Sequence, residues 1–284
     1  MSAFLTIFRF IPLIFIHFFG YVLGILIFIF SKTYRQHLCE NLNLINEKRW
    51  IMRLRVAGNA GCQVVEMLKL WSLSSEEIFD KKKYIKAKNV VNSEILHHAL
   101  QHKKNGILFI TPHLGCFEIT AQYFAYYFGN IKNITVLYRK AKNENLQNLI
   151  LQGRQREHLH LASADLSGVK KILSSLKKAN AVGILPDQVP KSGEGEWLEF
   201  FGKPAYTMVL AGKLSQIKNV HIIFAYAERL SFGRGYRLYF SKPSDKELKG
   251  DILERSQQIN KYLEKLIKQC PQQYLWGYNR FKKP

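Results

Sequence analysis

The chain has 284 residues and a formal net charge of +21, with 42 Lys and Arg against 21 Asp and Glu. Hydrophobic residues make up 47% and charged residues 22% of the sequence, which excludes a largely disordered chain. The length suits one large domain, or one domain plus an anchor. A balance this basic indicates an anionic partner: nucleic acid, anionic lipid, a phosphorylated substrate or an acidic carrier protein.

The four cysteines, Cys39, Cys62, Cys116 and Cys270, are scattered along the chain. None forms a C-x-x-C pair, so the spacing excludes a zinc ribbon and argues against a framework of disulfides. We therefore expect a reducing compartment.

The first element is an apolar stretch over residues 10–30, which holds 21 residues without a formal charge. A helix of that length just crosses a hydrocarbon core of roughly 30 Å, and the basic Lys32 and Arg35 that follow favour the cytoplasmic side. A cleaved signal peptide fits less well, because the apolar region is too long and no small-residue cleavage site follows it. We predict a membrane anchor over residues 1–31 and a cytoplasmic-face domain over 32–284. Two alternatives stay open: a helix packed against the domain, or one lying flat in the membrane interface.

The next segments are expected to be helical. Apolar spacing predicts a helix over residues 37–71, and residues 74–77 resemble a capped helical turn. Residues 84–88 alternate enough to predict a strand, and Ser93 is placed to cap a helix that ends near His102.

From there short apolar runs alternate with helical stretches, which predicts an α/β fold with a mostly parallel sheet flanked by helices. The expected strands are residues 107–111, 134–138, 159–163, 181–185 and 220–226. The expected helices between them are residues 116–127, 143–157, 166–178 and 207–216. Residues 236–241 are predicted to add an edge strand and 249–269 a long amphipathic helix.

His113 and Glu118 are the first candidates for chemistry, because they follow the strand predicted over 107–111. In open α/β sheets, reactive groups gather beyond the carboxyl ends of the strands. An imidazole at this position can take a proton from a hydroxyl, while a carboxylate fixes its tautomer. The alternative is a chance pair of surface or capping residues.

Asp187 likewise follows an expected strand, and a loop containing Gly193 and Gly195 comes after it. The loop leads to the aromatic segment 200–205, which is compact enough to line an apolar pocket. The alternative is a surface loop with a folded aromatic tip.

A third group is basic. Arg139 ends an expected strand, Arg154 and Arg156 end a helix, and Arg280 lies near the end of the chain. If these side chains converge on the strand-end rim, they form an anion site for phosphates. Otherwise they belong to solvated helix faces and a basic tail.

Several other sites are not expected. The sequence contains no G-x-S-x-G elbow, no G-x-x-x-x-G-K-[ST] loop and no G-x-G-x-x-G. His98 and His102 stand four residues apart without a supporting acid, which indicates a polar helix face. No metal and no cofactor is therefore expected.

Together these segments resemble the bacterial lipid A biosynthesis acyltransferases, the late lauroyl/myristoyl transferases. The resemblance covers almost the whole chain in the expected order and rests on the apolar start, Asn41-Leu42, His113 to Glu118, Tyr138-Arg139, Gly153-Arg154-x-Arg156, Leu185-Pro186-Asp187-Gln188, residues 200–207 and residues 270–282. The ending departs slightly, since many members have His-Arg-Arg where this chain has Tyr278-Asn279-Arg280.

The resemblance implies transfer of a fatty acyl chain, lauroyl or similar, from acyl carrier protein to a hydroxyacyl group of a Kdo-bearing lipid A precursor. It also implies the fold of the glycerolipid acyltransferases and a place at the cytoplasmic face of the bacterial inner membrane. Within it we expect His113 to be the general base and Glu118 its orienter. Substrate binding is expected to involve Arg139, Arg154, Arg156, Asp187 and Arg280.

Two other functions remain as alternatives. A lysophosphatidate-type glycerolipid acyltransferase shares the H-x-x-x-x-acid pattern, but its acid is usually Asp, and this chain has no Pro-Glu-Gly-Thr-Arg string. A membrane-tethered nucleic-acid-binding protein would suit the charge. However, no helix-turn-helix, zinc finger or aromatic RNA-binding signature is present, so no nucleic-acid partner is expected.

Overall fold

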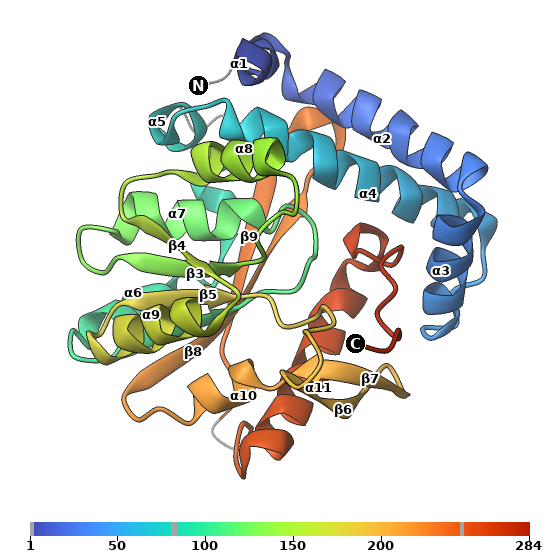
Figure 1. The fold of residues 1–284 in the computed structure, drawn as a ribbon. Helices are drawn as coiled ribbons and strands as arrows, with labels where there is room; N and C mark the ends of the chain where they lie inside the picture. Colours follow the sequence, from blue (N-terminus) through green and yellow to red (C-terminus); the bar gives the residue numbers. More distant parts are fainter. Residues whose placement is uncertain (1–2, 81–83, 245–246) are drawn as a thin grey trace.

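A seven-stranded sheet forms the centre of the molecule (Figure 1). The computed structural model describes residues 3–80, 84–244 and 247–284. The strands lie in the order β1-β9-β8-β2-β5-β3-β4. They are β1 (Val90–Val91), β2 (Gly106–Ile110), β3 (Ile134–Tyr138), β4 (Leu159–Ser163), β5 (Ala181–Ile184), β8 (Val220–Arg229) and β9 (Tyr236–Ser241).

Parallel pairing dominates this sheet, which confirms the predicted α/β architecture. Strand β2 runs parallel to β5 and β8, and β3 runs parallel to β4 and β5, whereas β8 and β9 are antiparallel. Two local predictions were wrong. Strand β9 is not an edge, because β1 pairs outside it, and residues 84–88 form no strand, since the extended backbone begins only at Val90.

Helices cover both faces of the sheet. The structure has α1 (Ala3–Phe10), α2 (Leu13–Phe30), α3 (Lys32–Asn43), α4 (Trp50–Trp71), α5 (Ser75–Phe79), α6 (Glu94–Gln101), α7 (Glu118–Phe128), α8 (Glu144–Arg154), α9 (Leu166–Lys177), α10 (Leu210–Ser215) and α11 (Ile252–Gln269). Short 3₁₀ turns are η1 (Ala87–Asn89), η2 (Ser231–Gly233) and η3 (Pro271–Gln273).

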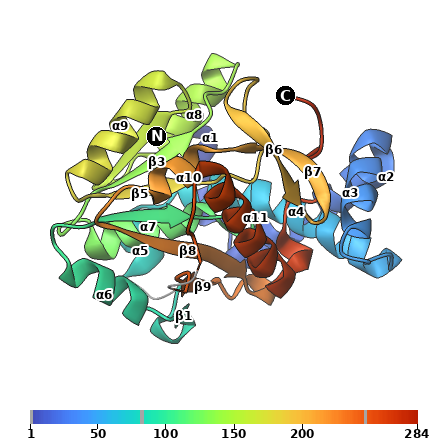
Figure 2. The same ribbon diagram turned by 90° about the horizontal axis from the view of Figure 1, so that it is seen from below.

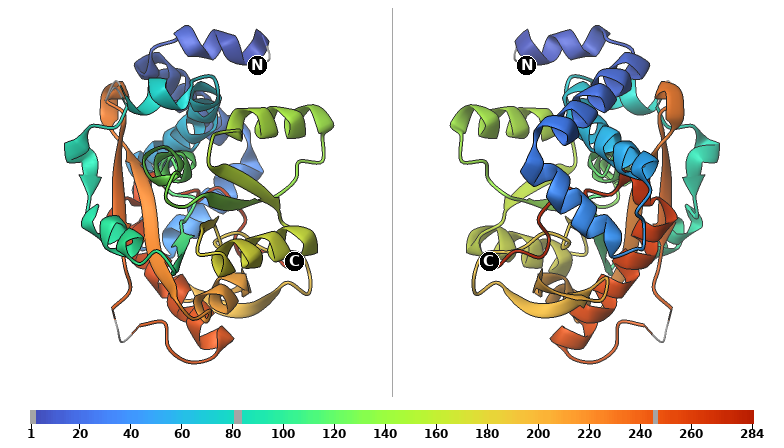
Figure 3. Two further views of the ribbon diagram at one scale, coloured as in Figure 1. Left: turned by 90° about the vertical axis from the view of Figure 1, so that its left-hand side faces the viewer. Right: turned by 90° about the vertical axis from the view of Figure 1, so that its right-hand side faces the viewer.

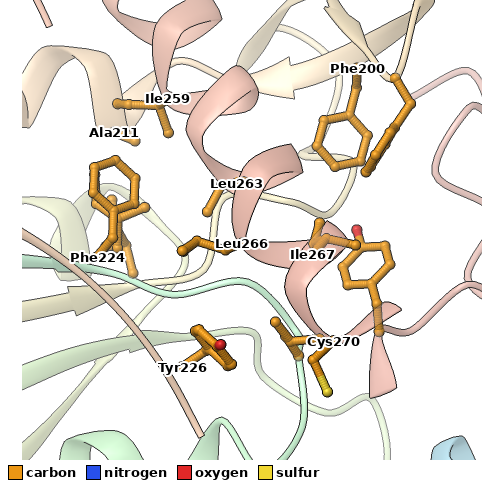
Figure 4. Close-up of a cluster of buried hydrophobic side chains, with 14 of the residues drawn as sticks. Phe200, Ala211, Phe224, Tyr226, Ile259, Leu263, Leu266, Ile267 and Cys270 are labelled. Atoms are coloured by element: carbon orange, nitrogen blue, oxygen red, sulfur yellow. The ribbon is translucent and has the colours of Figure 1, made fainter. Parts of the chain in front are cut away.

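Alternation along the strands divides the core into two clusters. Leu108 and Ile110 of β2 pack with α9, α10 and α11, while Ile107 and Phe109 pack with α5, α6 and α7. Successive side chains of a strand point to opposite faces, so an entirely apolar strand must be covered on both sides. Figure 2 shows α10 and α11 on one side of the sheet, and Figure 4 shows Leu263 and Leu266 of α11 within the first cluster.

The helix predicted over residues 37–71 is in fact two helices, α3 and α4, separated by a turn. The turn contains Asn46, whose φ of 57° lies in the left-handed region that asparagine tolerates. Met52 and Val56 of α4 belong to the first core cluster and Leu70 to the second. Helix α4 therefore crosses from one face of the sheet to the other.

The loop predicted after Asp187 contains an unexpected hairpin, β6 (Gly195–Phe200) and β7 (Lys203–Met208). Its turn holds Phe201 and Gly202 at positive φ. Phe200 and Phe201 are buried in the first core cluster, and Phe201 lies 5.3 Å from Trp276 between ring centroids. The aromatic tip is thus part of the core and not the lining of a pocket.

The apolar N-terminal stretch is also two helices, because Pro12 stands at the N-cap position of α2 and separates it from α1. Helix α2 alone is 18 residues long, about 27 Å. Of the helices in the described ranges, it is the one that is long and apolar enough to cross a membrane. It nevertheless packs along α4 at the surface of the domain (Figures 1 and 3).

A buried ionic cluster joins α2, α4 and the sheet. The Glu66 carboxylate of α4 accepts a hydrogen bond from Arg229 Nε at 2.8 Å and a second one from Arg229 Nη2. The Tyr236 hydroxyl donates to Glu66 at 3.0 Å, and His17 of α2 lies 3.2 Å from it. The guanidinium and the hydrogen bonds hold the pKa of Glu66 well below its usual range despite the burial.

Candidate active site

His113 and Asp187 form a hydrogen-bonded pair beyond the ends of two adjacent strands. His113 Nδ1 lies 2.7 Å from Asp187 Oδ1, and the His113 backbone N–H donates to Oδ2 at 2.8 Å. The register explains the contact, because Ile110 of β2 pairs with Ile184 of β5, and each functional residue stands three positions further on. Both oxygens of the carboxylate therefore hold the histidine.

This geometry determines which ring nitrogen is available. Asp187 is 1% exposed, and its pKa is lowered by the charge of His113 and by the hydrogen bonds, although burial alone would raise it. An ionised carboxylate can only accept, so Nδ1 of His113 carries the proton in the neutral ring. Nε2 then holds a lone pair, and the half-buried imidazole can act as a base through that atom.

The pairing of His113 with Glu118 that the sequence suggested is not formed. Glu118 begins α7 and accepts from Arg154 Nε at 2.8 and 3.1 Å and from Arg154 Nη2, a bidentate ion pair. The carboxylate that contacts His113 is instead that of Asp187, for which the sequence predicts substrate binding. The physical reason is the strand register, which brings Asp187 beside His113, while the start of α7 turns Glu118 toward the end of α8.

The loop that carries His113 is fixed on both sides. Gly115 has a φ of 59° and could not be replaced, since a Cβ there would lie 1.9 Å from the Ala227 carbonyl oxygen. Its N–H donates to the Gln273 carbonyl at 3.0 Å, and its carbonyl accepts from Gln63 Nε2 at 3.0 Å. Helix α4 thus holds the loop directly.

A small apolar cleft of about 60 Å³ lies beside this loop, between α7 and the sheet. Phe117, whose ring centroid lies 4.9 Å from that of His113, forms part of its wall, and so do Glu118 and Arg154. Apolar side chains from β2, β3, β4 and β5 line the rest. The predominantly apolar lining suits the hydrocarbon part of a ligand, whereas the volume is smaller than that of a pocket for a whole acyl chain.

Gln122 is a polar exception in the lining. It is 2% exposed, and neither its Oε1 nor its Nε2 has a hydrogen-bond partner within the described part of the chain. The residue stands one helical turn beyond Glu118, so its amide adds an unpaired donor and acceptor to the wall of the cleft.

We predict that Gln122→Leu stabilises the free protein by about 1–3 kcal/mol, because an unpaired buried amide is replaced by an apolar group of similar size. Denaturant titration measures the free energy of unfolding. Gln122→Glu is the control and should destabilise the protein, since it buries a charge. A loss of stability in the leucine variant would show that the amide is hydrogen-bonded after all.

The basic side chains do not form the predicted cluster. Arg156 Nη2 donates to the carbonyls of Leu70 and Leu73, and Arg280 is 3% exposed and donates to the Tyr206 carbonyl and to Thr207 Oγ1. Both guanidinium groups bind other segments of the protein. Arg280 is buried away from any surface, while Arg156 is partly exposed, so substrate binding by Arg156 stays a prediction.

The other two arginines lie at the end of strand β3 and at the end of helix α8. Arg139 is exposed at the end of β3, with one hydrogen bond of 2.9 Å to the Val189 carbonyl. Arg154 lines the cleft beside Glu118, and its side chain is 19% exposed. An anion site at this rim would therefore be smaller than predicted.

The sequence profile of the bacterial lipid A biosynthesis acyltransferases matches residues 1–283 of the chain. The chain therefore belongs to this family. The match confirms the resemblance seen in the sequence and does not favour a lysophosphatidate-type enzyme.

Three relatives show how distant the similarity is. The chain is 26% identical over 184 residues to the lipid A biosynthesis lauroyltransferase of Escherichia coli, and 25% over 183 residues to the palmitoleoyltransferase of that organism. Both alignments cover 64% of this chain and 58% of the relative. Lipid A biosynthesis acyltransferase 2 of Shigella flexneri is 22% identical over 254 residues, covering 87% of this chain and 77% of the relative.

Sequence reasoning missed two residues that shape the site. Gln63, which holds the Gly115 carbonyl, lies within a predicted helix and has no signal that distinguishes it from any polar helix residue. Gln122 stands four residues after Glu118, so helical spacing alone would have placed the two on one face. The contact between His113 and Asp187 could be predicted only in part. Both residues follow expected strands, but the sequence does not show which strands are neighbours in the sheet.

Proposed function

We propose that this protein transfers a fatty acyl chain from acyl carrier protein to a hydroxyl of a Kdo-bearing lipid A precursor. The observation that carries the proposal is the His113–Asp187 pair beside an apolar cleft, in a chain of the lipid A acyltransferase family. The pair supplies a base for a hydroxyl, and the apolar lining of the cleft suits the hydrocarbon of an acyl chain.

In the proposed reaction, Nε2 of His113 takes the proton of the acceptor hydroxyl as its oxygen attacks the thioester carbonyl. Asp187 keeps the ring oriented and stabilises the imidazolium that forms. The tetrahedral intermediate then expels the carrier thiolate, which takes the proton back from Nε2. The products are the new ester and the free thiol of the carrier protein, and His113 is neutral again.

Arg154 is proposed to hold an anionic group next to His113. Its Nε and Nη2 engage Glu118, whereas Nη1 donates no hydrogen bond to any described residue. Glu118 thereby orients the guanidinium and leaves one edge of it toward the cleft. A phosphate of the acceptor or the developing oxyanion of the thioester could be bound there. The exposed Arg139 is proposed to add a second contact for a phosphate.

We predict that Arg154→Lys lowers kcat/KM at least tenfold although the charge is retained. A lysine side chain cannot form the bidentate ion pair with Glu118 and also donate a hydrogen bond to the substrate. A raised KM would indicate lost binding, and a lowered kcat would indicate a contact made in the transition state. Arg139→Lys is the matched control and should change kcat/KM less. Unchanged kinetics in Arg154→Lys would restrict this arginine to a structural role.

The location is part of the proposal. We propose that residues 1–31 attach the protein to the bacterial inner membrane, with residues 32–284 as a catalytic domain on the cytoplasmic side, of the fold shared with glycerolipid acyltransferases. The charge of +21 supports this, because acyl carrier protein, a phosphorylated glycolipid and anionic lipid headgroups are all acidic.

Mass spectrometry of lipid A from cells with and without this protein tests the function. We expect one acyl substituent to disappear when the gene is deleted and to return with the wild-type chain but not with His113→Ala. Purified protein with a series of acyl-carrier donors then gives the chain length. Unchanged lipid A, together with altered glycerophospholipids, would favour the lysophosphatidate-type alternative.

A further inference from the structure

The outward side of α2 is a continuous apolar stripe that no other part of the described chain covers. Large apolar side chains on it are between 38% and 82% exposed along the whole helix. They are Ile14, Phe15, Phe18, Phe19, Val22, Leu23, Leu26, Ile27, Ile29 and Phe30. A patch of this extent is rare on a soluble monomer and indicates an interaction surface.

The inward side of α2 is in close contact with α4. A Cβ on Gly24 would lie 2.0 Å from the Ala57 carbonyl oxygen, and one on Gly61 would lie 2.0 Å from the Gly20 carbonyl oxygen. The two helix backbones therefore touch, as in the small-residue contacts of membrane helices.

Contacts at both ends show that α4 accompanies the whole apolar segment. Near its start, Lys69 Nζ donates to the carbonyls of Phe8 at 2.9 Å and Arg9 at 2.6 Å. Near its end, the rings of Phe28 and Trp50 lie 5.3 Å apart. Figure 1 shows α2 and α4 side by side over their length.

This arrangement is incompatible with α2 crossing a bilayer. Helix α4 would have to enter the hydrocarbon with it, together with the exposed Arg55 and the ionic cluster around Glu66. Charged groups are costly at the bilayer centre. The domain attached to α4 would have to follow as well, because Gln63 is bonded to the His113 loop.

The surroundings of α2 fit a helix that lies in the membrane plane. At its start, a Cβ on Gly233 would lie 2.5 Å from the Ile14 nitrogen, so η2 adjoins the helix there, and Phe232 of η2 is 81% exposed. At its end, Trp50 is 56% exposed. The apolar surface thus continues onto the domain at both ends of α2, as it would if both ends face the same leaflet.

Basic residues also lie near both ends of the segment. Arg9, which is ion-paired with Glu77, and the exposed Arg234, which follows η2, lie near the start of α2. The exposed Lys32 follows its end. A crossing helix typically has its excess of basic residues on one side, whereas a helix in the interface can have them at both ends, at the level of anionic headgroups.

We infer that α2 does not span the membrane but lies flat in one leaflet of an anionic bilayer, with its outer stripe among the acyl chains and α4 behind it. This deepens the proposed membrane attachment and rests on it. Because Cys62 Sγ donates to the His17 carbonyl of α2 at 3.1 Å and the next residue, Gln63, holds Gly115, the His113 loop is kept at a fixed distance from the leaflet. An acceptor lipid could then react without leaving the membrane.

Two measurements on the full chain in inverted inner-membrane vesicles test the inference. In the first, an epitope tag with a protease site precedes residue 1, and Thr33→Cys is labelled with an impermeant maleimide in a Cys39→Ser background. A flat helix predicts that both are accessible from the same, cytoplasmic, face. Cleavage of the tag only from the other face would overturn the inference.

The second measurement gives the depth of three positions of α2 in the bilayer. Nitroxide labels are placed singly at Phe15→Cys, Leu23→Cys and Phe30→Cys in the same background, in vesicles of phosphatidylethanolamine and phosphatidylglycerol. We expect the three labels to be equally deep, within a few ångströms. A spanning helix would place Leu23 deepest and the other two near opposite surfaces. Leu166→Cys, an exposed apolar site on α9, is the aqueous control.

The remaining outcomes are also decisive. Spin–spin broadening between copies, without contact with lipid, would assign the stripe to a second copy of this chain and overturn the inference. Acyl transfer is assayed on the same samples. Uniform depth without acyl transfer would leave the flat placement standing and contradict the proposed function, whereas an active protein with graded depth would contradict the placement alone.

Discussion

Replacing His113 by Gln should lower kcat by about 10²–10⁴-fold, because positioned proton removal typically contributes that factor. In the proposed reaction, the acceptor hydroxyl is far too weakly acidic to attack a thioester unaided at neutral pH. Glutamine keeps much of the shape of the imidazole, so the protein should remain folded. Acyl transfer from the acyl-carrier donor, with unfolding measured in parallel, checks both expectations.

Asp187→Asn should produce a loss of similar size, because an amide can neither fix the tautomer of His113 nor stabilise its cation. The double variant with His113→Gln should be scarcely worse than either single change, since the two residues act as a unit. Additive losses would mean that Asp187 acts independently. Glu118→Gln should impair the reaction differently, through Arg154, and should resemble Arg154→Lys in its effects on kcat and KM.

The largest effect on stability is expected at Glu66. Changing it to Gln should lower the free energy of unfolding by about 3–5 kcal/mol, because Arg229 would remain charged and buried without a counter-charge. Burial lowers and the Glu66 charge raises the pKa of Arg229, with a net increase, so the arginine cannot easily escape by losing its proton. Thermal or denaturant unfolding in detergent or lipid measures the change.

The same pair predicts a dependence on pH. The pKa of Glu66 is lower in the folded protein than in the unfolded chain, so its contribution is present at neutral pH and disappears as the pH falls through the acidic range. Wild-type protein should therefore lose stability between about pH 4.5 and pH 2 by more than Glu66→Gln does. Parallel acid titrations of the two proteins would contradict this reading of the cluster. Glu157→Gln, at a carboxylate that is 89% exposed, is the control and should behave as wild type.

Much of the fold follows from local sequence. The runs at 134–138 and 159–163 are strands with the predicted bounds. The first is rich in β-branched residues, whereas the second alternates apolar and polar residues at its start, with Leu159 buried and His160 exposed, as fits its place at the edge of the sheet. The local sequence also predicts that His113 and Asp187 each follow the end of a strand. The family, too, follows from an ordered set of short segments that each carry little information alone.

The sequence by itself therefore determined the class of fold, the family and the candidates for chemistry. Only the tertiary structure decided which candidates meet. The order of the strands brings Asp187 to His113, and the start of α7 turns Glu118 toward Arg154. Arg156 and Arg280 bind carbonyl groups of other segments of the protein. The tertiary structure also decided where the apolar N-terminal segment lies. Its length alone fits a membrane span, but its glycines allow close packing against α4. The physical reason is common to both cases. The hydrophobic period and the turn residues determine local secondary structure over a few positions of the chain. Strand order and helix contacts depend on surfaces that are far apart in the sequence and meet only when the core forms.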